Sequence, residues 1–222
     1  MNNYYILKEN TLFKNMSEDD VNSLFLIGNS YIKKYEKNEI ILREGDSNTN
    51  IYFILEGMLS IYQSDIDGNP FLKSKQSPPD AFAYIFALTK HASNCTVFAN
   101  SSATILVVNL DTIMHSNSST VIKFKNNLII SLANATYNTS SHLSILSLKS
   151  LRYKIFNYLA KFNYISSTYF TIPLNREEMA QYLGVNRTSL SKELIALKAE
   201  KILDYHKNKF IILNIDYFED SI

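Results

Sequence analysis

A short basic segment near the C-terminal end of the chain carries the side chains best suited to contact a ligand. Four of its residues lie in the first turns of a predicted helix, directly after the capping residue Asn186: Arg187, Thr188, Ser189 and Lys192. An Arg guanidinium matches O6 and N7 of guanine, Lys pairs with phosphate, and hydroxyls bond base edges or backbone oxygens. The segment therefore has the composition of a nucleic-acid contact.

Two predicted helices position this segment. Asn175 and Glu178, three residues apart, form a capping pair at the start of the first helix, and Gly184 provides the turn after it. Leu190 and Leu194 recur at helical spacing in the second helix. Two helices joined by a tight turn, the second with basic residues near its start, are typical of a helix-turn-helix, whose second helix enters the major groove.

A predicted hairpin at residues 202–213 follows, with Lys207 and Lys209 at its tip, as in a wing. Residues 149–222 hold 11 Lys and Arg against 8 Asp and Glu, whereas residues 1–148 hold 11 against 13. The positive charge thus lies in the part assigned to DNA. A winged helix that contacts a protein instead of DNA is the alternative from another functional class.

Residues 174–192, LNREEMAQYLGVNRTSLSK, resemble the C-terminal helix-turn-helix of the Crp/Fnr family of bacterial transcription regulators. Residues 45–57 resemble the jelly roll of that family, and residues 146–152 resemble its hinge. Thr188 differs from the Glu that many members carry, and since Glu would accept a hydrogen bond from cytosine N4, we expect a different target half-site. The DNA-contacting residues that the resemblance implies are Arg176, Asn186, Arg187, Thr188, Ser189, Lys192, Lys207 and Lys209.

The resemblance also implies the partners of the chain. These are double-stranded DNA with a palindromic operator, a second copy of the chain and a small-molecule effector of unknown identity. RNA polymerase is a partner that the resemblance leaves open. No membrane partner is expected.

The N-terminal part of the chain predicts a β domain. Between residues 38 and 110 short β-prone runs alternate with turn signals, among them a predicted hairpin tip at residues 65–70. We expect an α+β chain with an effector-sensing, cyclic-nucleotide-binding-like jelly roll over residues 1–118. A dimerisation helix at 119–146 and a winged helix-turn-helix DNA-binding domain at 147–222 would follow.

Apolar residues at steps of three and four predict a long helix over roughly residues 119 to 143. A second apolar line, formed by Ile122, Ile129 and Ala133, lies beside the main stripe. We expect the helix to cover the barrel on one side and to pair with its copy on the other. The alternative is a helix packed only on its own domain. The stripe assigned to the dimer interface consists of Val121, Phe124, Leu128, Leu132 and Ala135.

The effector site departs from the pattern of members that bind cyclic nucleotides. Those members use a Glu for the ribose hydroxyl and an Arg for the cyclic phosphate, where this chain has Tyr84 and Ser93. Lys90 and His91 lie nearby, but neither reproduces a guanidinium fork. We expect an effector other than a cyclic nucleotide, with a cAMP- or cGMP-responsive regulator as the alternative. The pocket candidates are Phe82, Tyr84, Ser93, Asn94, Thr139 and Ser140.

Other classes of protein find little support in the sequence. A single Cys95 and four scattered His residues, with a net charge of +1, predict no metal site, no cofactor and no disulfide. No phosphate loop or nucleophile elbow occurs, so we expect no catalytic residues and no enzyme activity. No secretion signal and no run of 18 apolar residues occurs, which favours the cytoplasm.

Overall fold

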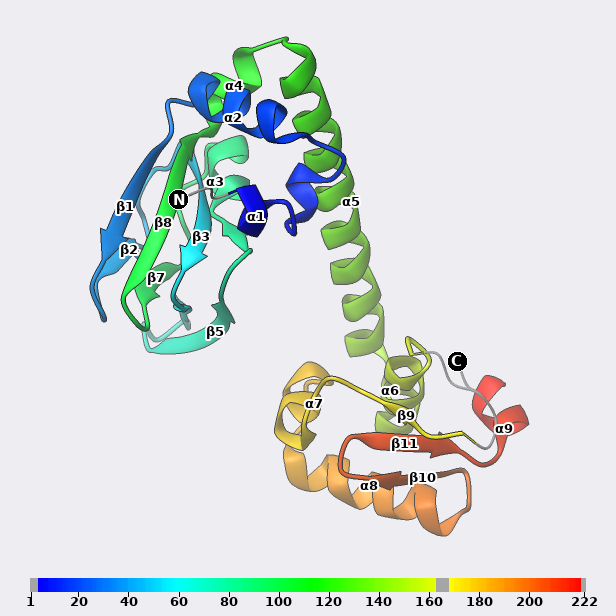
Figure 1. Cartoon of the computed structure of the whole chain (residues 1–222). Helices are drawn as coiled ribbons and strands as arrows, with labels where there is room; N and C mark the ends of the chain where they lie inside the picture. Colours follow the sequence, from blue (N-terminus) through cyan, green and yellow to red (C-terminus); the bar gives the residue numbers. More distant parts are fainter. Residues whose placement is uncertain (1–3, 163–167, 221–222) are drawn as a thin grey trace. The chain divides into compact units, whose positions relative to one another are not determined.

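The computed structural model describes residues 4–162 and 168–220, which form two compact units, Met1–Ala133 and Asn134–Ile222. The fold is α+β, as expected, and a long helix α5 (Ser119–Ser147) runs from the first unit into the second (Figure 1). The other helices of the first unit are α1 (Tyr4–Leu7), the 3-10 turn η1 (Thr11–Phe13), α2 (Glu18–Ile27), α3 (Tyr84–Thr89) and α4 (Leu110–His115).

The first unit is built on two four-stranded antiparallel sheets, with strand orders β1-β8-β3-β6 and β2-β7-β4-β5. The expected jelly-roll type of β domain is therefore confirmed, although the sequence had not indicated β1, β6 or β7. The strands are β1 (Tyr31–Tyr35), β2 (Ile40–Leu42), β3 (Asn50–Glu56), β4 (Leu59–Ser64), β5 (Pro70–Gln76), β6 (Ala81–Phe82), β7 (Thr96–Ala99) and β8 (Ala103–Asn109).

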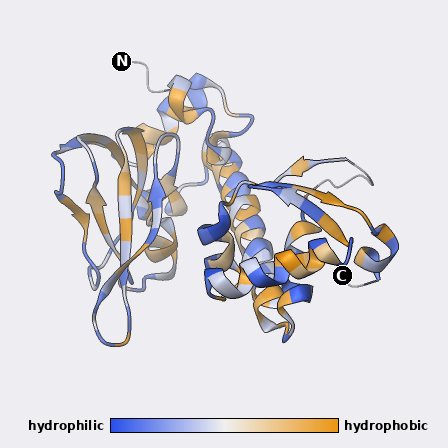
Figure 2. Ribbon diagram, turned by 90° about the horizontal axis from the view of Figure 1, so that it is seen from below, coloured by the Kyte–Doolittle hydropathy of each residue, from blue (hydrophilic) through white to orange (hydrophobic). Residues whose placement is uncertain are grey.

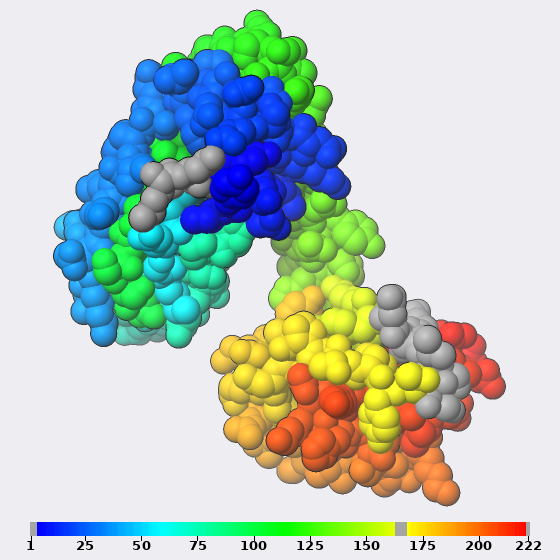
Figure 3. Space-filling view, in the orientation of Figure 1, coloured from blue at the N-terminus to red at the C-terminus, as the bar shows by residue number. Residues whose placement is uncertain are grey.

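Strand β3 is buried on both faces, so it reads as an unbroken apolar run instead of an alternating one. Tyr52 and Ile54 point into the core between the two sheets. Ile51 and Phe53 point to the other face, where α1, η1, α2 and α5 cover the sheet. The space-filling view shows the N-terminal helices, in blue, packed beside the cyan and green segments of this unit (Figure 3).

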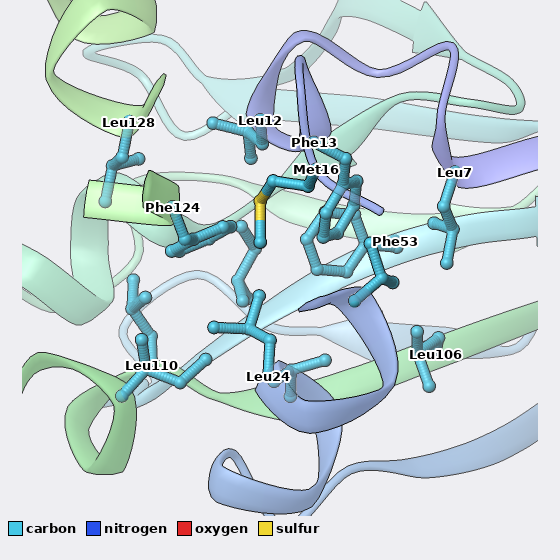
Figure 4. Packing of buried hydrophobic residues seen from close by; sticks show 14 of the residues in the cluster. Leu7, Leu12, Phe13, Met16, Leu24, Phe53, Leu106, Leu110, Phe124 and Leu128 are labelled. Carbon is cyan, nitrogen blue, oxygen red and sulfur yellow. The ribbon is translucent and has the colours of Figure 1, made fainter. Parts of the chain in front are cut away.

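The first half of α5 belongs to the core between this sheet face and the N-terminal helices (Figure 4). Val121 and Phe124 are 0% exposed and Leu128 is 2% exposed, with the Phe124 ring 6.0 Å from that of Phe13. These side chains have no surface left to bury, so their assignment to a dimer interface is wrong. Leu132 packs at the edge of the same core. The periodicity identified the stripe correctly but not the surface that covers it, which is the N-terminal segment of the same chain.

Polar contacts extend this attachment of α5. Asp20 on α2 accepts hydrogen bonds from Lys123 Nζ at 2.7 Å and from Thr120 Oγ1 at 3.1 Å. The ammonium of Lys123, with the backbone N–H of Ser17, lowers the pKa of Asp20 to about 2. Asn127 donates to the backbone carbonyl of Leu12 at 3.0 Å. Helix α5 is thus fixed to the N-terminal helices by both apolar and polar contacts.

The second apolar line of α5 is exposed. Ile122 is 50% exposed and Ile129 is 63% exposed, and Ala133 is also open to solvent. Ala135, at the end of the main stripe, is exposed as well, and its assignment to a dimer interface stays a prediction. The hydropathy view shows hydrophobic and hydrophilic residues mixed along the helices (Figure 2). The face beside the buried stripe is therefore an apolar surface that nothing in the described part of the chain covers.

The second unit follows α5 with helix α6 (Leu151–Leu159) and a three-stranded sheet of order β10-β11-β9. Its other elements are β9 (Phe170–Thr171), α7 (Arg176–Tyr182), α8 (Arg187–Ala199), β10 (Leu203–His206), β11 (Lys209–Ile212) and α9 (Ile215–Glu219). The expected hairpin at 202–213 is confirmed by β10 and β11, which pair in antiparallel register. Across the described residues, no helix combines the length and apolar character needed to span a lipid bilayer.

Phe124 tests the corrected role of the α5 stripe. Because Phe124→Ala removes a ring from a closed core, we expect the free energy of unfolding of the first unit to fall by about 3–5 kcal/mol. Leu26→Ala, at a position 81% exposed on α2, is the control and should change it by less than about 0.5 kcal/mol. Urea unfolding followed by circular dichroism measures both. Equally small losses of unfolding free energy in both variants would show that Phe124 is not part of a closed core.

Candidate nucleic-acid interface

Helix α7 begins where the capping pair predicted it. The Asn175 side chain accepts the backbone N–H groups of Glu177 at 2.9 Å and Glu178 at 3.0 Å. In return, the Glu178 carboxylate accepts the backbone N–H of Asn175 at 2.8 Å. These three backbone N–H groups at the helix start are thereby satisfied, so α7 has a fixed beginning.

The turn between α7 and α8 depends on Gly184, whose φ is +66°. This left-handed conformation strains residues that carry a Cβ, and an added Cβ would also lie 3.1 Å from Leu146 Cδ2. The backbone N–H of Val185 bonds the Ala180 carbonyl at 3.0 Å, and the Asn186 side chain then accepts the N–H of Ser189 at 2.7 Å. The predicted helix-turn-helix is confirmed.

Helix α8 has a buried face and a polar exposed face. Leu190, Leu194 and Leu197 are all 0% exposed and anchor it in the core of the second unit. Three of the sequence-predicted contact residues share the open side near its start: Arg187, Thr188 and Lys192. Ser189 is half-buried, and Asn186 is exposed but uses its carbonyl oxygen as the helix cap.

Arg187 faces a carboxylate in the free protein. Its guanidinium lies 3.7 Å from the Glu177 carboxylate, and the two side chains are 65% and 56% exposed. An ion pair this exposed contributes little stability, because water and salt screen it. Arg187 is therefore held near its position but can exchange Glu177 for another acceptor at small cost.

Arg176 is anchored within the second unit, and its assignment as a DNA contact stays a prediction. Its guanidinium donates to the Lys207 carbonyl at 2.9 Å and lies over the rings of Tyr205 and Phe210, at 5.0 and 5.4 Å from the centroids. Burial among these groups lowers the pKa of Arg176. The side chain ties the start of α7 to the hairpin tip, so its charge is already engaged inside the fold.

The hairpin tip presents two exposed lysines, as expected for a wing. Lys207 has a left-handed φ of +54° and Lys209 begins β11. Asn208 between them donates to the Ile172 carbonyl at 3.0 Å and fixes the tip against the segment after β9. Both ammonium groups thus lie on a loop that hydrogen bonds fix in place, and neither forms an ion pair with a described carboxylate.

Sequence reasoning missed the role of Arg152 in orienting α8. This residue of α6 pairs through two nitrogens with Glu200, at 2.6 and 2.7 Å, and through Nε with Glu193 at 2.8 Å. The guanidinium lowers the pKa of Glu200. Bidentate pairs of this kind fix direction as well as distance. Two Glu residues seven positions apart on a predicted helix were the available signal, because they lie on one helix face.

Comparison with protein-family models finds two matches. Residues 32–115 match the cyclic nucleotide-binding domain, and residues 154–221 match the Crp-like helix-turn-helix domain. The two models cover more than half of the chain, in this order. The chain belongs to the Crp/Fnr family. It is a DNA-binding transcription regulator, and regulators with this helix-turn-helix function as dimers.

Solved structures of Crp/Fnr regulators share the fold. The catabolite activator protein of Thermus thermophilus aligns with a TM-score of 0.57 at 17% identity, over 96% of this chain and 98% of that one. A CooA mutant from Carboxydothermus hydrogenoformans aligns with a TM-score of 0.58 at 17% identity, over 89% and 90% of the two chains. A comparison with curated protein sequences gives no significant match.

The structure places only some of the effector-pocket candidates of this Crp/Fnr chain around one cavity. Phe82, Tyr84 and Asn94 line one cavity of the first unit. Ser93 is 2% exposed and turns into its own loop, where its hydroxyl donates to the Cys95 carbonyl at 2.7 Å. Lys90, the nearest cation in sequence, is ion-paired with Asp111.

Thr139 and Ser140 belong to the second unit. Both are exposed on α5, and the Thr139 hydroxyl donates to the Ala135 carbonyl at 2.9 Å. Ser140 borders a groove with other residues of α5, with Asn157 of α6 and with Lys161, which follows α6. Their part in effector binding stays a prediction.

The anchor role of Arg176 predicts a stability effect. Arg176→Ala should lower the free energy of unfolding of the second unit by about 2 kcal/mol, because a charged hydrogen bond and two cation–π contacts are lost. Arg187→Ala removes an equal charge from an exposed site and should change stability by less than about 0.5 kcal/mol. Thermal unfolding of the two variants compares them. Similar melting temperatures for both would show that Arg176 is not an anchor.

Proposed function

We propose that this Crp/Fnr regulator binds a palindromic operator as a homodimer and responds to an effector other than a cyclic nucleotide. In this proposal residues 1–118 sense the effector, residues 119–146 dimerise, and residues 147–222 bind DNA. The protein acts by binding and not by catalysis, in the cytoplasm where its DNA lies. A contact with RNA polymerase belongs to the same proposal.

The observation that carries the DNA contact is the open face at the start of α8. Arg187, Thr188 and Lys192 share that face, and buried leucines behind them fix its direction. Arg187 follows the cap directly and so lies at the helix end that approaches the groove floor. Lys192 is more than a turn further on, and Lys207 and Lys209 stand on the wing. This arrangement supports base recognition by Arg187 and phosphate contacts by the three lysines.

The state of the cassette supports an effector other than a cyclic nucleotide. Ser93 stands where the Arg of nucleotide-binding members is expected from the resemblance, and its hydroxyl is bonded within its loop. Lys90 pairs with Asp111 and is not among the residues that line the cavity, so it does not take the place of the guanidinium there. A cyclic phosphate in this cavity would meet no guanidinium from the described residues that line it.

Arg187 and Lys192 test the division of labour on α8. Arg187→Ala should cost about 1–3 kcal/mol of affinity on sites that carry the recognised guanine and much less on sites without it. Lys192→Ala should weaken matched and mismatched DNA equally and reduce the salt slope by about one. Gel shifts at several salt concentrations, on an operator selected from random DNA, measure both effects.

Lys37→Ala is the control, because Lys37 is an exposed cation of the first unit outside the proposed interface. Equal losses on both sites for Arg187→Ala would make Arg187 a backbone contact. A wild-type protein that shifts no DNA would favour the winged helix as a protein-binding module.

The uncovered face of α5 supports dimerisation. Ile122, Ile129 and Ala133 are spaced by seven and four residues, which keeps them on one side of a helix. Exposed isoleucines at such spacing are costly in a monomer, and an identical helix related by a two-fold axis can cover them. We therefore place the dimer contact on this line and not on the buried stripe.

Ile129→Asp should convert the dimer to a monomer, because a carboxylate at the centre of an apolar seam opposes its own copy. Asn138→Asp introduces the same charge at an exposed position on another side of α5 and should leave the dimer intact. Light scattering at micromolar concentration gives the mass of each. A monomeric wild type, or a dimeric Ile129→Asp variant, would contradict this placement.

A further inference from the structure

A cavity of about 230 Å³ lies in the first unit. It is bounded by β2, β4, β5 and β7, by β6 with the start of α3, and by the loop before β7. Most of its walls are apolar. The lining residues used below are Ile61, Lys73, Ser74, Gln76, Phe82 and Ile85.

The polar side of the cavity comes from strand β5. In the register with β4, Gln76 lies opposite Leu59 and Ser74 lies opposite Ile61. Because Leu59 and Ile61 are buried in the core between the sheets, their partners share the inward face. A strand whose residues are mostly exposed thus turns two polar side chains inward.

A β-bulge adds a cation to the same wall. Ile61 pairs with Ser74 and Tyr62 with Leu72, so Lys73 is the extra residue of β5 between them. A bulge breaks the alternation of side chains, which allows Lys73 and its neighbour Ser74 both to line the cavity. Among the described lining residues Lys73 carries the one charge, and it pairs with no described carboxylate.

The wall also holds an unsatisfied acceptor. The Oε1 atom of Gln76 is buried and has no hydrogen-bond partner among the residues that the structure describes. Buried polar atoms without a partner are rare in native proteins, and a ligand that brings a donor relieves the penalty. The described residues of the lining include no Asp or Glu that could hold a ribose hydroxyl.

We infer that this cavity binds a small carboxylic acid with an apolar body and one O–H or N–H donor. The carboxylate pairs with Lys73, the body packs on Ile61, Phe82 and Ile85, and the donor reaches Gln76. A single lysine matches a compact monoanion, and the volume is below that of pockets for drug-sized ligands. The inference deepens the proposed function, because it names the chemical class of the effector.

Calorimetry on the full-length protein tests the inference with three probes. 4-Hydroxybenzoate carries the acid, the apolar ring and a donor. 4-Hydroxybenzamide lacks the charge, and benzoate lacks the hydroxyl donor. We expect 4-hydroxybenzoate to bind at least about tenfold more tightly than either analogue, the change produced by one charged or buried hydrogen bond.

Two variants assign the contacts. Lys73→Met should remove the preference over the amide, and Gln76→Leu should remove the preference over benzoate. Lys75→Met is the matched control, because Lys75 lies opposite Ser60 on the same strand and does not line the cavity. It should bind 4-hydroxybenzoate as the wild type does.

Several results would overturn the inference. These are no saturable binding of 4-hydroxybenzoate at millimolar concentration, equal binding of acid and amide by the wild type, or tighter binding of cyclic AMP than of the acid. A gel shift of the wild type without any probe is run in parallel. If the wild type shifts no DNA, the result counts against the proposed DNA binding alone. The calorimetry tests the class of ligand separately.

Discussion

The packing of Phe124 against the N-terminal core determines what the rest of α5 can do. The Phe13 ring lies 6.0 Å from that of Phe124 and 5.0 Å from that of Phe53 on β3, and Val121 and Leu128 belong to the same core. A helix face that is fully buried in one unit cannot serve a second partner. The apolar line beside it, which includes Ile122 and Ile129, is therefore the surface on which assembly depends.

In the second unit, helix α8 likewise has one face buried in its own core and another face open. Its leucines are buried on one side, while Arg152 holds the opposite end of the helix through Glu193 and Glu200. Because these contacts lie on the inner face and at the far end, they leave the exposed side at the start of α8 open. Arg187 and Lys192 are thus exposed on a rigid helix, which reduces the ordering cost of binding. Arg176 does the same for the wing by tying its tip to α7.

Local chemistry in the sequence predicted much of this fold. The caps at Asn175 and Asn186 and the turn at Gly184 act through neighbours in the chain, so their positions could be read directly. Periodicity likewise identified α5, but it gives only which residues share a face. The partner of that face is a long-range property, and here the N-terminal helices, which were not predicted from the sequence, occupy it. The bulge at Lys73 and the burial of Arg176 are long-range in the same sense.

The loop from Lys90 to Cys95 offers few groups to an anion, which explains why the proposed effector places its charge elsewhere in the cavity. Its backbone and hydroxyl groups are already engaged: the Ser93 N–H donates to the Asp46 carbonyl at 2.9 Å, and the Gly45 N–H donates to the Ser93 carbonyl at 2.7 Å. A loop bonded in this way has few donors left for a ligand, and a serine supplies no charge. The unpaired cation lies instead on β5, across the apolar floor formed by Ile61 and Val97. A ligand that contacts both β5 and the loop then directs its charge toward β5 and its apolar body toward Phe82. A guanidinium in the loop would instead draw the charge toward the loop.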